Sequence, residues 1–139
     1  FIELAGKVNE NMPYYCRSVI AESLDRRCGI ALSRARVQVL GVAYKAGVAD
    51  VRESPALKLI SLLQEAGAEV AYHDPYVAEI EELELVSRPL EPEAYDAVVI
   101  VTAHPDVDYE RLIDRARLVV DFRNATGEAG RLADNVRKL

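Results

Sequence analysis

Residues 37–43 read VQVLGVA, a short and mostly apolar run that decides the expected fold. Continuous apolar runs of this length are typical of strands that are buried on both faces of a sheet. After a loop, Ser54 and Pro55 form the N-cap and first-turn pair with which a helix begins. This helix is expected to end at Gly67, and a second apolar strand follows at residues 68–72. The order of strand, crossover helix and strand predicts a right-handed parallel unit.

Two more buried strands are expected downstream, at residues 96–101 and 117–122. A short helix capped by Asp108 separates them, and a short acidic helix at 78–82 and an edge strand at 83–86 precede them. Continuous apolar strands that alternate with helices favour a parallel sheet covered on both faces. We therefore predict an α/β fold, a Rossmann-like three-layer domain.

Residues 1–30 are expected to be helical and to end at Gly29, ahead of the α/β part. Asn11 and Met12 precede Pro13 as a helix start would, so Pro13 either kinks one long helix or separates two. Apolar side chains then recur at spacings near three and four, which predicts one buried helix face. The residues assigned to that face are Tyr15, Val19, Ile20 and Leu24.

The 139 residues suffice for one domain of ordinary size, and 50% of them are apolar and 29% charged, as in globular proteins. This balance excludes a disordered tail and a fibrous protein. The net charge of −6 favours neither nucleic acid nor an anionic membrane surface as a partner. The longest apolar stretch, residues 97–103, is far shorter than the roughly 20 residues that cross a bilayer. The chain starts at Phe1, and we expect it to begin inside a longer protein.

The cysteines and histidines show no metal-binding or disulfide pattern. Cys16 and Cys28 lack CxxC spacing, which favours a reduced cytosolic protein, and Cys16 is interpreted as a small core residue of the first helix. His73 and His104 are interpreted as strand-end or loop histidines. We expect no metal site and no complete catalytic set in this chain.

Residues just beyond the expected strands are the candidates for a binding site, because open parallel sheets bind ligands at the carboxyl ends of their strands. Tyr44 and Lys45 follow the first strand, Arg52 precedes the next helix, and Arg123 follows the last strand. Cations near a helix N-terminus predict an anionic ligand, with the Tyr44 ring as a stacking surface. The alternative is that Lys45 and Arg52 are surface cations neutralised by nearby carboxylates.

No GxGxxG motif follows the first strand and no P-loop is present, so autonomous NAD binding is not expected. Asp74 ends the second strand, where nucleotide folds place a ribose-binding acid. The following Pro75 fits a turn-forming role at least as well.

Residues 41–45 (GVAYK), followed by residues 50–55 (DVRESP), closely resemble the C-terminal, UDP-binding domain of the UDP-glucose/GDP-mannose dehydrogenase family. Further matches are residues 74–76 (DPY), 95–97 (YDA) with Thr102, and 121–124 (DFRN). The resemblance spans about residues 36 to 126. The segment at residues 1–5 (FIELA) and the GVAYK wording are most similar to the UDP-N-acetylhexosamine 6-dehydrogenases.

The resemblance implies part of an NAD-dependent oxidoreductase that converts the C6 hydroxyl of a nucleotide sugar to a carboxylate with two NAD. UDP-N-acetylhexosamine is favoured as the substrate, ahead of UDP-glucose. Residues 1–30 would be a helical segment of the central dimerisation region, and residues 31–139 the UDP-sugar-binding α/β domain. The family's catalytic-cysteine motif is missing, so we expect this chain alone to be inactive.

Carried over residue by residue, Tyr44, Lys45 and Arg123 match positions that contact the UDP-sugar, and Arg52 matches an arginine that reaches the NAD. The resemblance implies that NAD is bound mainly by an N-terminal domain outside this chain. It also implies a cytoplasmic homodimer that serves polysaccharide biosynthesis. The alternative is a non-catalytic Rossmann-like domain whose first helices mediate oligomerisation or another interaction.

Overall fold

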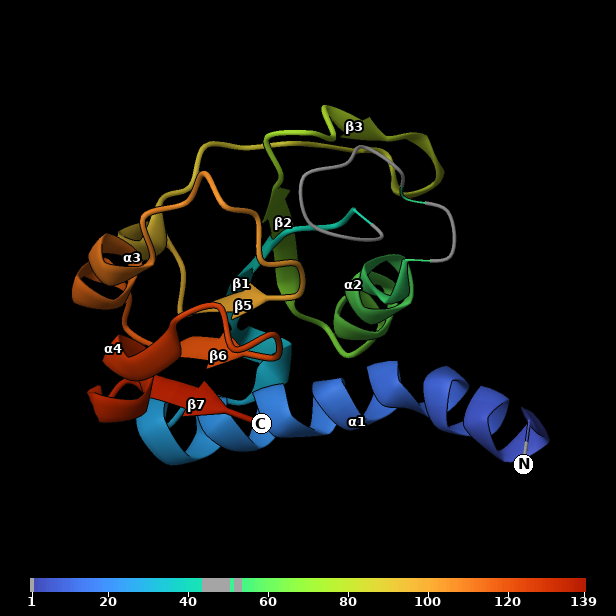
Figure 1. Ribbon diagram of the computed structural model, residues 1–139, viewed down its shortest axis with the longest axis horizontal. Coiled ribbons are helices and arrows are strands. Elements are labelled where there is room, and N and C mark those ends of the chain that lie inside the picture. The colour runs from blue at the N-terminus through green and yellow to red at the C-terminus, as the bar shows by residue number, and fades with distance from the viewer. Residues whose placement is uncertain (1, 44–50, 52–53) are drawn as a thin grey trace.

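The computed structural model describes residues 2–43, residue 51 and residues 54–139 (Figure 1). Within them, the five-stranded sheet is parallel throughout and has the order β2-β1-β5-β6-β7. Its strands are β1 (Arg36–Leu40), β2 (Glu69–His73), β5 (Ala97–Ile100), β6 (Val119–Asp121) and β7 (Val136–Lys138). The four sheet strands that the sequence predicts are confirmed. β5, which reads AVVI, is buried along its whole length, as a strand inside a covered parallel sheet should be.

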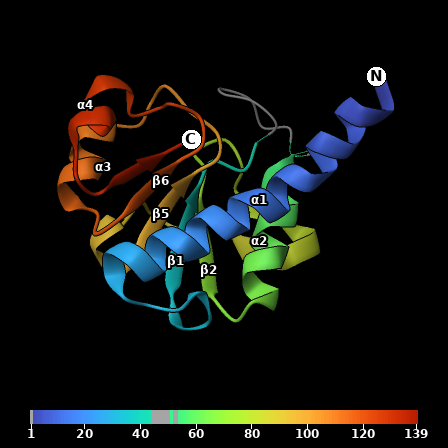
Figure 2. The same ribbon diagram turned by 90° about the horizontal axis from the view of Figure 1, so that it is seen from below.

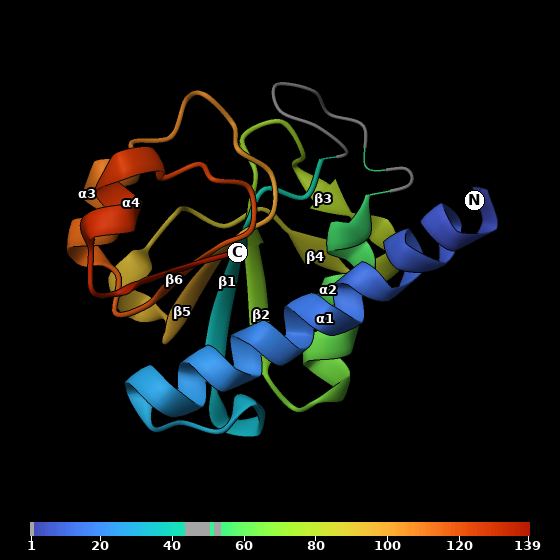
Figure 3. The same cartoon turned by 60° about the horizontal axis from the view of Figure 1, so that its bottom comes forward.

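Helices cover both faces of the sheet, which gives the three layers that the sequence predicts (Figures 1 and 3). The helices α1 (Ile2–Cys28) and α2 (Pro55–Glu65) pack on one face, and α3 (Tyr109–Arg115) and α4 (Gly127–Leu132) on the other. Successive side chains of β1 point to opposite faces. Val37 and Val39 belong to the core under α1 and α2, whereas Leu40 belongs to the core under α3.

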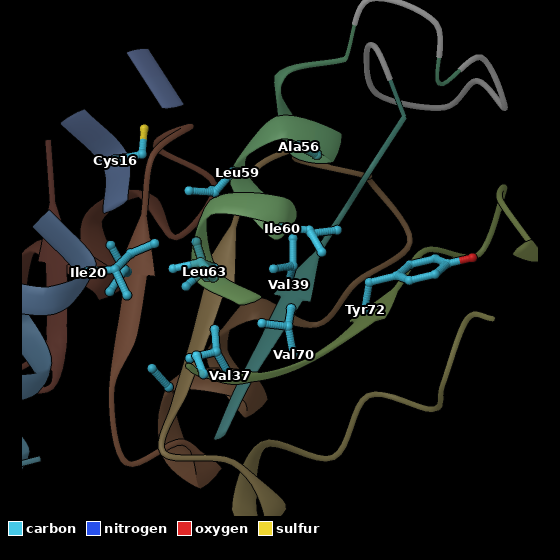
Figure 4. Packing of buried hydrophobic residues seen from close by; sticks show 14 of the residues in the cluster. Cys16, Ile20, Val37, Val39, Ala56, Leu59, Ile60, Leu63, Val70 and Tyr72 are labelled. Carbon is cyan, nitrogen blue, oxygen red and sulfur yellow. The ribbon is translucent and has the colours of Figure 1, made fainter. Parts of the chain in front are cut away.

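The larger core joins the helical segment to the sheet. Figure 4 shows Ile20 of α1 and Leu63 of α2 among the side chains of this core, which also contains Val37 and Val39. All four side chains are fully buried. Burying side chains of this size stabilises a fold by about 1.5–3 kcal/mol each. α1 is therefore held on the sheet by the same apolar contacts that hold α2.

α1 is one helix that continues through Pro13, which decides between the two alternatives for this segment. Seen from below, its N-terminal part extends past α2 (Figure 2). The buried face of α1 contains Val19, Ile20 and Leu24, as predicted, but Tyr15 is 52% exposed and its assignment to this face is wrong. Cys16, one position further along, occupies that place in the core, which confirms its interpretation as a core residue.

Helix ends follow the predicted signals. Ser54 caps α2, because its side chain accepts a hydrogen bond from the N–H of Ala56, and Pro55 is the first helical residue. Asp108 caps α3 by accepting from the N–H of Arg111 at 3.1 Å. These caps fix where the connections after β1 and β5 become helical.

The segment between β2 and β5 differs from the prediction. The acidic helix expected at 78–82 is wrong, because this stretch holds β3 (Glu79–Ile80) and a single 3-10 turn at Glu81–Leu83. β3 pairs antiparallel with β4 (Leu85–Val86), which lies inside the predicted edge strand. Two further 3-10 turns occupy Leu32–Arg34 and Pro92–Ala94. None of the helices in the described residues is long and apolar enough to span a membrane.

Candidate functional site

The chain changes direction across the sheet between β1 and β5. From β1 it moves outward to β2 at one edge, whereas from β5 it continues through β6 to β7 at the other. The carboxyl ends of two such neighbouring strands are the place where open α/β sheets bind ligands. The described residues there are 41–43 after β1 and 101–104 after β5, and Asp74 after β2 lies beside them. We call residues 41–43, 74 and 101–104 the strand-exit cluster.

Gly41 allows the exit of β1 to pass very close to the exit of β5. Its φ is +87°, and a Cβ at this position would lie 2.6 Å from both the Cβ and the carbonyl oxygen of Thr102. Its N–H donates a hydrogen bond of 2.9 Å to the carbonyl oxygen of His73. Only glycine combines this backbone conformation with this contact. The strand predicted for residues 37–43 therefore ends earlier, at Leu40.

One buried carboxylate joins the exits of three strands. Asp74 is 1% exposed, and its Oδ2 accepts hydrogen bonds from the N–H groups of Val42 (2.8 Å) and Ala43 (3.0 Å). The same oxygen lies 2.9 Å from Nε2 of His104. The other oxygen, Oδ1, accepts from the N–H of Tyr76 at 2.8 Å. These hydrogen bonds offset the loss of hydration that burial imposes on the carboxylate.

Thr102 holds the same peptide segment from its other side. Its hydroxyl donates a hydrogen bond of 2.8 Å to the carbonyl oxygen of Ala43. The two residues are 4% and 1% exposed. Ala43 is thus bonded through its N–H to Asp74 and through its C=O to Thr102. Buried side chains fix both backbone polar groups of this residue.

Two tyrosines extend the cluster outward around His104. The Tyr76 ring lies 4.8 Å from the imidazole between centroids, and its hydroxyl donates to Asp106. That hydrogen bond is the main cause of the raised pKa of Tyr76. Tyr109 donates to the carbonyl oxygen of His104 at 2.8 Å, and burial, with a smaller effect of the Asp121 charge, raises the pKa of Tyr109 to about 12. Both phenols are therefore neutral hydrogen-bond donors near pH 7.

A second buried carboxylate shapes the turn after β6. Asp121 accepts hydrogen bonds from the N–H groups of Arg123 (3.0 Å), Ala125 (3.1 Å) and Thr126 (2.9 Å), and from the Thr126 hydroxyl. Burial acts to raise the pKa of the Asp121 carboxyl, but these hydrogen bonds together outweigh it and lower the pKa. The turn continues with Asn124 at a φ of +56°. It presents the exposed Arg123 at the carboxyl edge of the sheet.

The four binding residues that the sequence singles out do not all fall in the described part. Arg123 lies at the carboxyl edge of the sheet, just after β6, in agreement with its place after the last predicted strand. Tyr44, Lys45 and Arg52 lie outside the described residues. Tyr44 and Lys45 directly follow Ala43, the residue that Asp74 and Thr102 hold.

The structure also decides what Asp74 does and adds residues that sequence reasoning missed. The contact from Oδ1 to the N–H of Tyr76, two residues on, is the turn-forming bond that Asp74 followed by Pro75 predicts. The buried and fully bonded carboxylate is not presented to a ribose. His104 does follow a strand, as expected, but it is completely buried beside Asp74. No local pattern signals this pair, because the two residues are 30 positions apart.

Elsewhere on the described part of the chain, a hollow of about 450 Å³ lies along the outer edge of β2. Its charged lining residues are Arg36, Glu69, Glu84, Arg88 and Glu91. Arg36 is already bonded to Glu69 at 2.9 Å. Three carboxylates against two cations do not favour an anionic ligand in this hollow. Among the described residues, no group of three or more His, Cys, Asp and Glu side chains is placed to hold a metal ion.

Comparison with known proteins adds evidence that is independent of this geometry. Residues 38–128 match a family model described as the UDP binding domain of the UDP-glucose/GDP-mannose dehydrogenase family. A UDP-N-acetyl-D-mannosamine dehydrogenase from Pyrococcus horikoshii is 37% identical over 133 residues, which cover 91% of this chain and 30% of that protein. A UDP-glucose 6-dehydrogenase from Rhizobium meliloti is 34% identical over 135 residues, with 88% and 30% covered. The chain thus spans about a third of the length of these relatives.

Solved structures give the same picture. The UDP-D-ManNAc dehydrogenase from Pyrococcus horikoshii superposes with a TM-score of 0.76 at 32% identity, over 99% of this chain and 32% of that chain. The NDP-N-acetyl-D-galactosaminuronic acid dehydrogenase from Methanosarcina mazei Go1 superposes with a TM-score of 0.83 at 26% identity, over 98% and 30%. Both likenesses extend through α1 as well as the sheet, since nearly the whole chain is covered.

Proposed function

The chain belongs to the UDP-glucose/GDP-mannose dehydrogenase family, and from this premise we propose that it is the domain that holds the UDP-sugar during an NAD-dependent oxidation. The reaction proposed for the full-length enzyme converts the C6 hydroxyl of the sugar to a carboxylate. UDP-N-acetylhexosamine is the favoured substrate, ahead of UDP-glucose. Relatives named for both kinds of sugar support this order of preference, and the former is named more often among them.

The observation that carries this proposal is the position of the family match on the fold. The matched segment, residues 38–128, contains the whole strand-exit cluster and the turn that carries Arg123. Both lie at the carboxyl edge of the parallel sheet, and the cluster lies where the chain changes direction. A nucleotide site at this place agrees with the general rule for open α/β sheets.

Each proposed binding residue has a role that suits its chemistry. Lys45 and Arg123 would meet the pyrophosphate or sugar oxygens through charge-assisted hydrogen bonds. Tyr44 would offer its ring as a stacking surface. Arg52 would bring a fixed cation to the bound NAD. The exposure of Arg123 on its turn leaves this guanidinium accessible to an anionic ligand.

NAD itself does not fit the described residues of this chain as its main binding site. The turn after β1 lacks the closely spaced glycines of a dinucleotide site, and Asp74 is buried and bonded. We therefore assign NAD to a separate N-terminal domain of the full-length enzyme. That domain, the UDP-sugar and a second copy of the enzyme are the proposed partners, and the 139-residue chain alone is proposed to be inactive.

The proposal extends to the rest of the chain and to its setting. Residues 1–30 are proposed to belong to a central dimerisation region, and residues 31–139 to form the UDP-sugar-binding domain. α1 ends at Cys28, which supports a boundary at this place. The full-length enzyme is proposed to act in the cytoplasm and to supply oxidised sugars for polysaccharide biosynthesis.

Calorimetric titration of the 139-residue chain with UDP, and separately with NAD, tests the proposal. We expect UDP to bind, NAD to bind far more weakly, and Arg123→Ala to weaken UDP binding. Arg26→Ala is the matched control, because it removes an exposed guanidinium of α1 that is paired only on the surface, with Glu22. Absence of UDP binding, or equal UDP affinity in the Arg123→Ala variant, would contradict the proposal.

A further inference from the structure

Ala43 is the point at which the described chain leaves the sheet toward the proposed binding residues. Its N–H is bonded to Asp74 at 3.0 Å and its C=O to the Thr102 hydroxyl at 2.8 Å. The next two residues in the sequence are Tyr44 and Lys45. A peptide that is bonded on both sides by buried side chains has one fixed direction.

We propose that Thr102 and Asp74 are positioning residues of the nucleotide site, because they clamp the Ala43 peptide and so set the direction from which Tyr44 and Lys45 approach the ligand. This inference rests on the proposed function. Neither side chain touches the nucleotide, since Thr102 is 4% and Asp74 1% exposed. Their effect on binding passes through the backbone of Ala43.

The two sides of the clamp come from different strands. Asp74 follows β2 and Thr102 follows β5, while Ala43 follows β1, which lies between them in the sheet. The close approach of Gly41 to Thr102 removes the space in which this peptide would otherwise turn. Without the Thr102 bond, the carbonyl of Ala43 is free to reorient, and the binding residues must be ordered when the ligand arrives. Ordering on binding lowers affinity, and a preformed arrangement avoids that loss.

Thr102→Val tests the inference most cleanly, because valine keeps the shape of threonine and removes the hydroxyl donor. Thr102→Ser restores a hydroxyl and is the rescue variant. Ser23→Ala is the matched control, since it removes another buried hydroxyl that donates to a backbone carbonyl, that of Val19 in α1. Thr102→Ala removes the hydroxyl with a smaller side chain and replaces the valine variant if that variant does not fold.

The readout is the dissociation constant for UDP of the 139-residue chain, measured where every variant is folded by circular dichroism. We expect Thr102→Val to weaken UDP binding by about 3- to 10-fold, the range that one net hydrogen bond corresponds to. Thr102→Ser should restore most of the affinity. Ser23→Ala should lower the unfolding temperature and leave the dissociation constant unchanged.

The outcomes separate this inference from the proposed function. If the unmodified chain binds UDP and Thr102→Val binds it equally well, positioning is overturned and the proposed function stands. An equal loss of affinity in Thr102→Val and Ser23→Ala also overturns positioning, because a general loss of stability then explains both. If the unmodified chain does not bind UDP, the proposed function fails, and the inference that rests on it fails with it.

Discussion

Asp74 and His104 form a fully buried pair, with Oδ2 and Nε2 2.9 Å apart and both side chains 0% exposed. The pair joins the residue after β2 to the connection after β5, across the exit of β1 that lies between them. Because Asp74 also accepts the N–H groups of Val42 and Ala43, one side chain holds the exits of three neighbouring strands. The geometry of the proposed binding edge therefore depends on a group that is itself hidden from the ligand.

Replacing Asp74 by asparagine should destabilise the fold. An amide cannot accept on both of its heteroatoms, so at least one of the buried N–H donors that face Asp74 loses its acceptor. We expect Asp74→Asn to lower the free energy of unfolding by about 2–4 kcal/mol, measured by urea denaturation. Asp25→Asn, at an exposed position of α1, is the control and should change stability little. Equal stability of the two variants would show that the Asp74 bonds do not hold the strand exits.

Gly41 and Gly29 offer a matched test of the close approach between strand exits. Both have positive φ, but a Cβ at Gly29 meets no atom within 4 Å, whereas a Cβ at Gly41 meets Thr102 at 2.6 Å. Gly29→Ala should cost only the backbone conformation, about 1–2 kcal/mol. Gly41→Ala adds a backbone clash and should cost clearly more, or prevent folding, as seen by thermal unfolding. Similar unfolding temperatures for both variants would argue against this contact.

Asp121 should make stability depend on acidity. Its pKa is lowered from 3.8 in the folded chain, so the unfolded state binds more protons than the folded state as the pH falls below about 3.8. The contribution of Asp121 is therefore fully present above this range and is lost as the pH falls through the folded pKa. Asp121→Asn should be less stable at neutral pH and should lose less further stability on acidification.

The acid dependence is measured as unfolding temperature from about pH 7 to about pH 3. Asp114→Asn removes an exposed carboxylate of α3 and is the charge-matched control, which should follow the unmodified chain. If Asp121→Asn also runs parallel to the unmodified chain over this range, the bonds to Thr126, Arg123 and Ala125 do not have the assigned effect.

Ser54 should stabilise the start of α2 by capping. Its side chain accepts from the N–H of Ala56, so Ser54→Ala should cost about 1 kcal/mol in the free energy of unfolding. Ser61→Ala changes the same residue type inside α2, where alanine is the better helix former, and should be neutral or stabilising. Ser54→Asp, which retains an acceptor, should restore stability. A cap role is ruled out if the alanine and aspartate variants at residue 54 are equally destabilised.

The sheet strands that could be predicted are those whose apolar runs are long enough to show burial. β1 and β5 are of this kind, and their pairing follows from the parallel topology. β7 (Val136–Lys138), with one buried apolar residue, and the six-residue α4 give no such signal. Both acquire their structure from contacts with neighbouring elements rather than from local pattern.

The helix phase and the site show the limits of local reasoning more sharply. Tyr15 and Cys16 are adjacent, and spacing alone did not decide which of them faces the core, whereas packing against α2 and the sheet did. The position of Arg123 could be predicted because a residue after a parallel strand lies at a known edge. The contacts of Asp74 with His104 and of Ala43 with Thr102 join residues 30 and 59 positions apart, and only the fold brings them together.

The measurement that tests the account most directly is a titration of the isotope-labelled 139-residue chain with UDP, followed by amide chemical shifts. The account predicts saturable shifts at Ala43, at residues 101–104 and at Arg123, with little change at Arg36 and Glu69 beside the hollow on β2. Shifts centred on that hollow, or no shifts at all, would contradict the claim that the carboxyl edge of the sheet binds a uridine nucleotide.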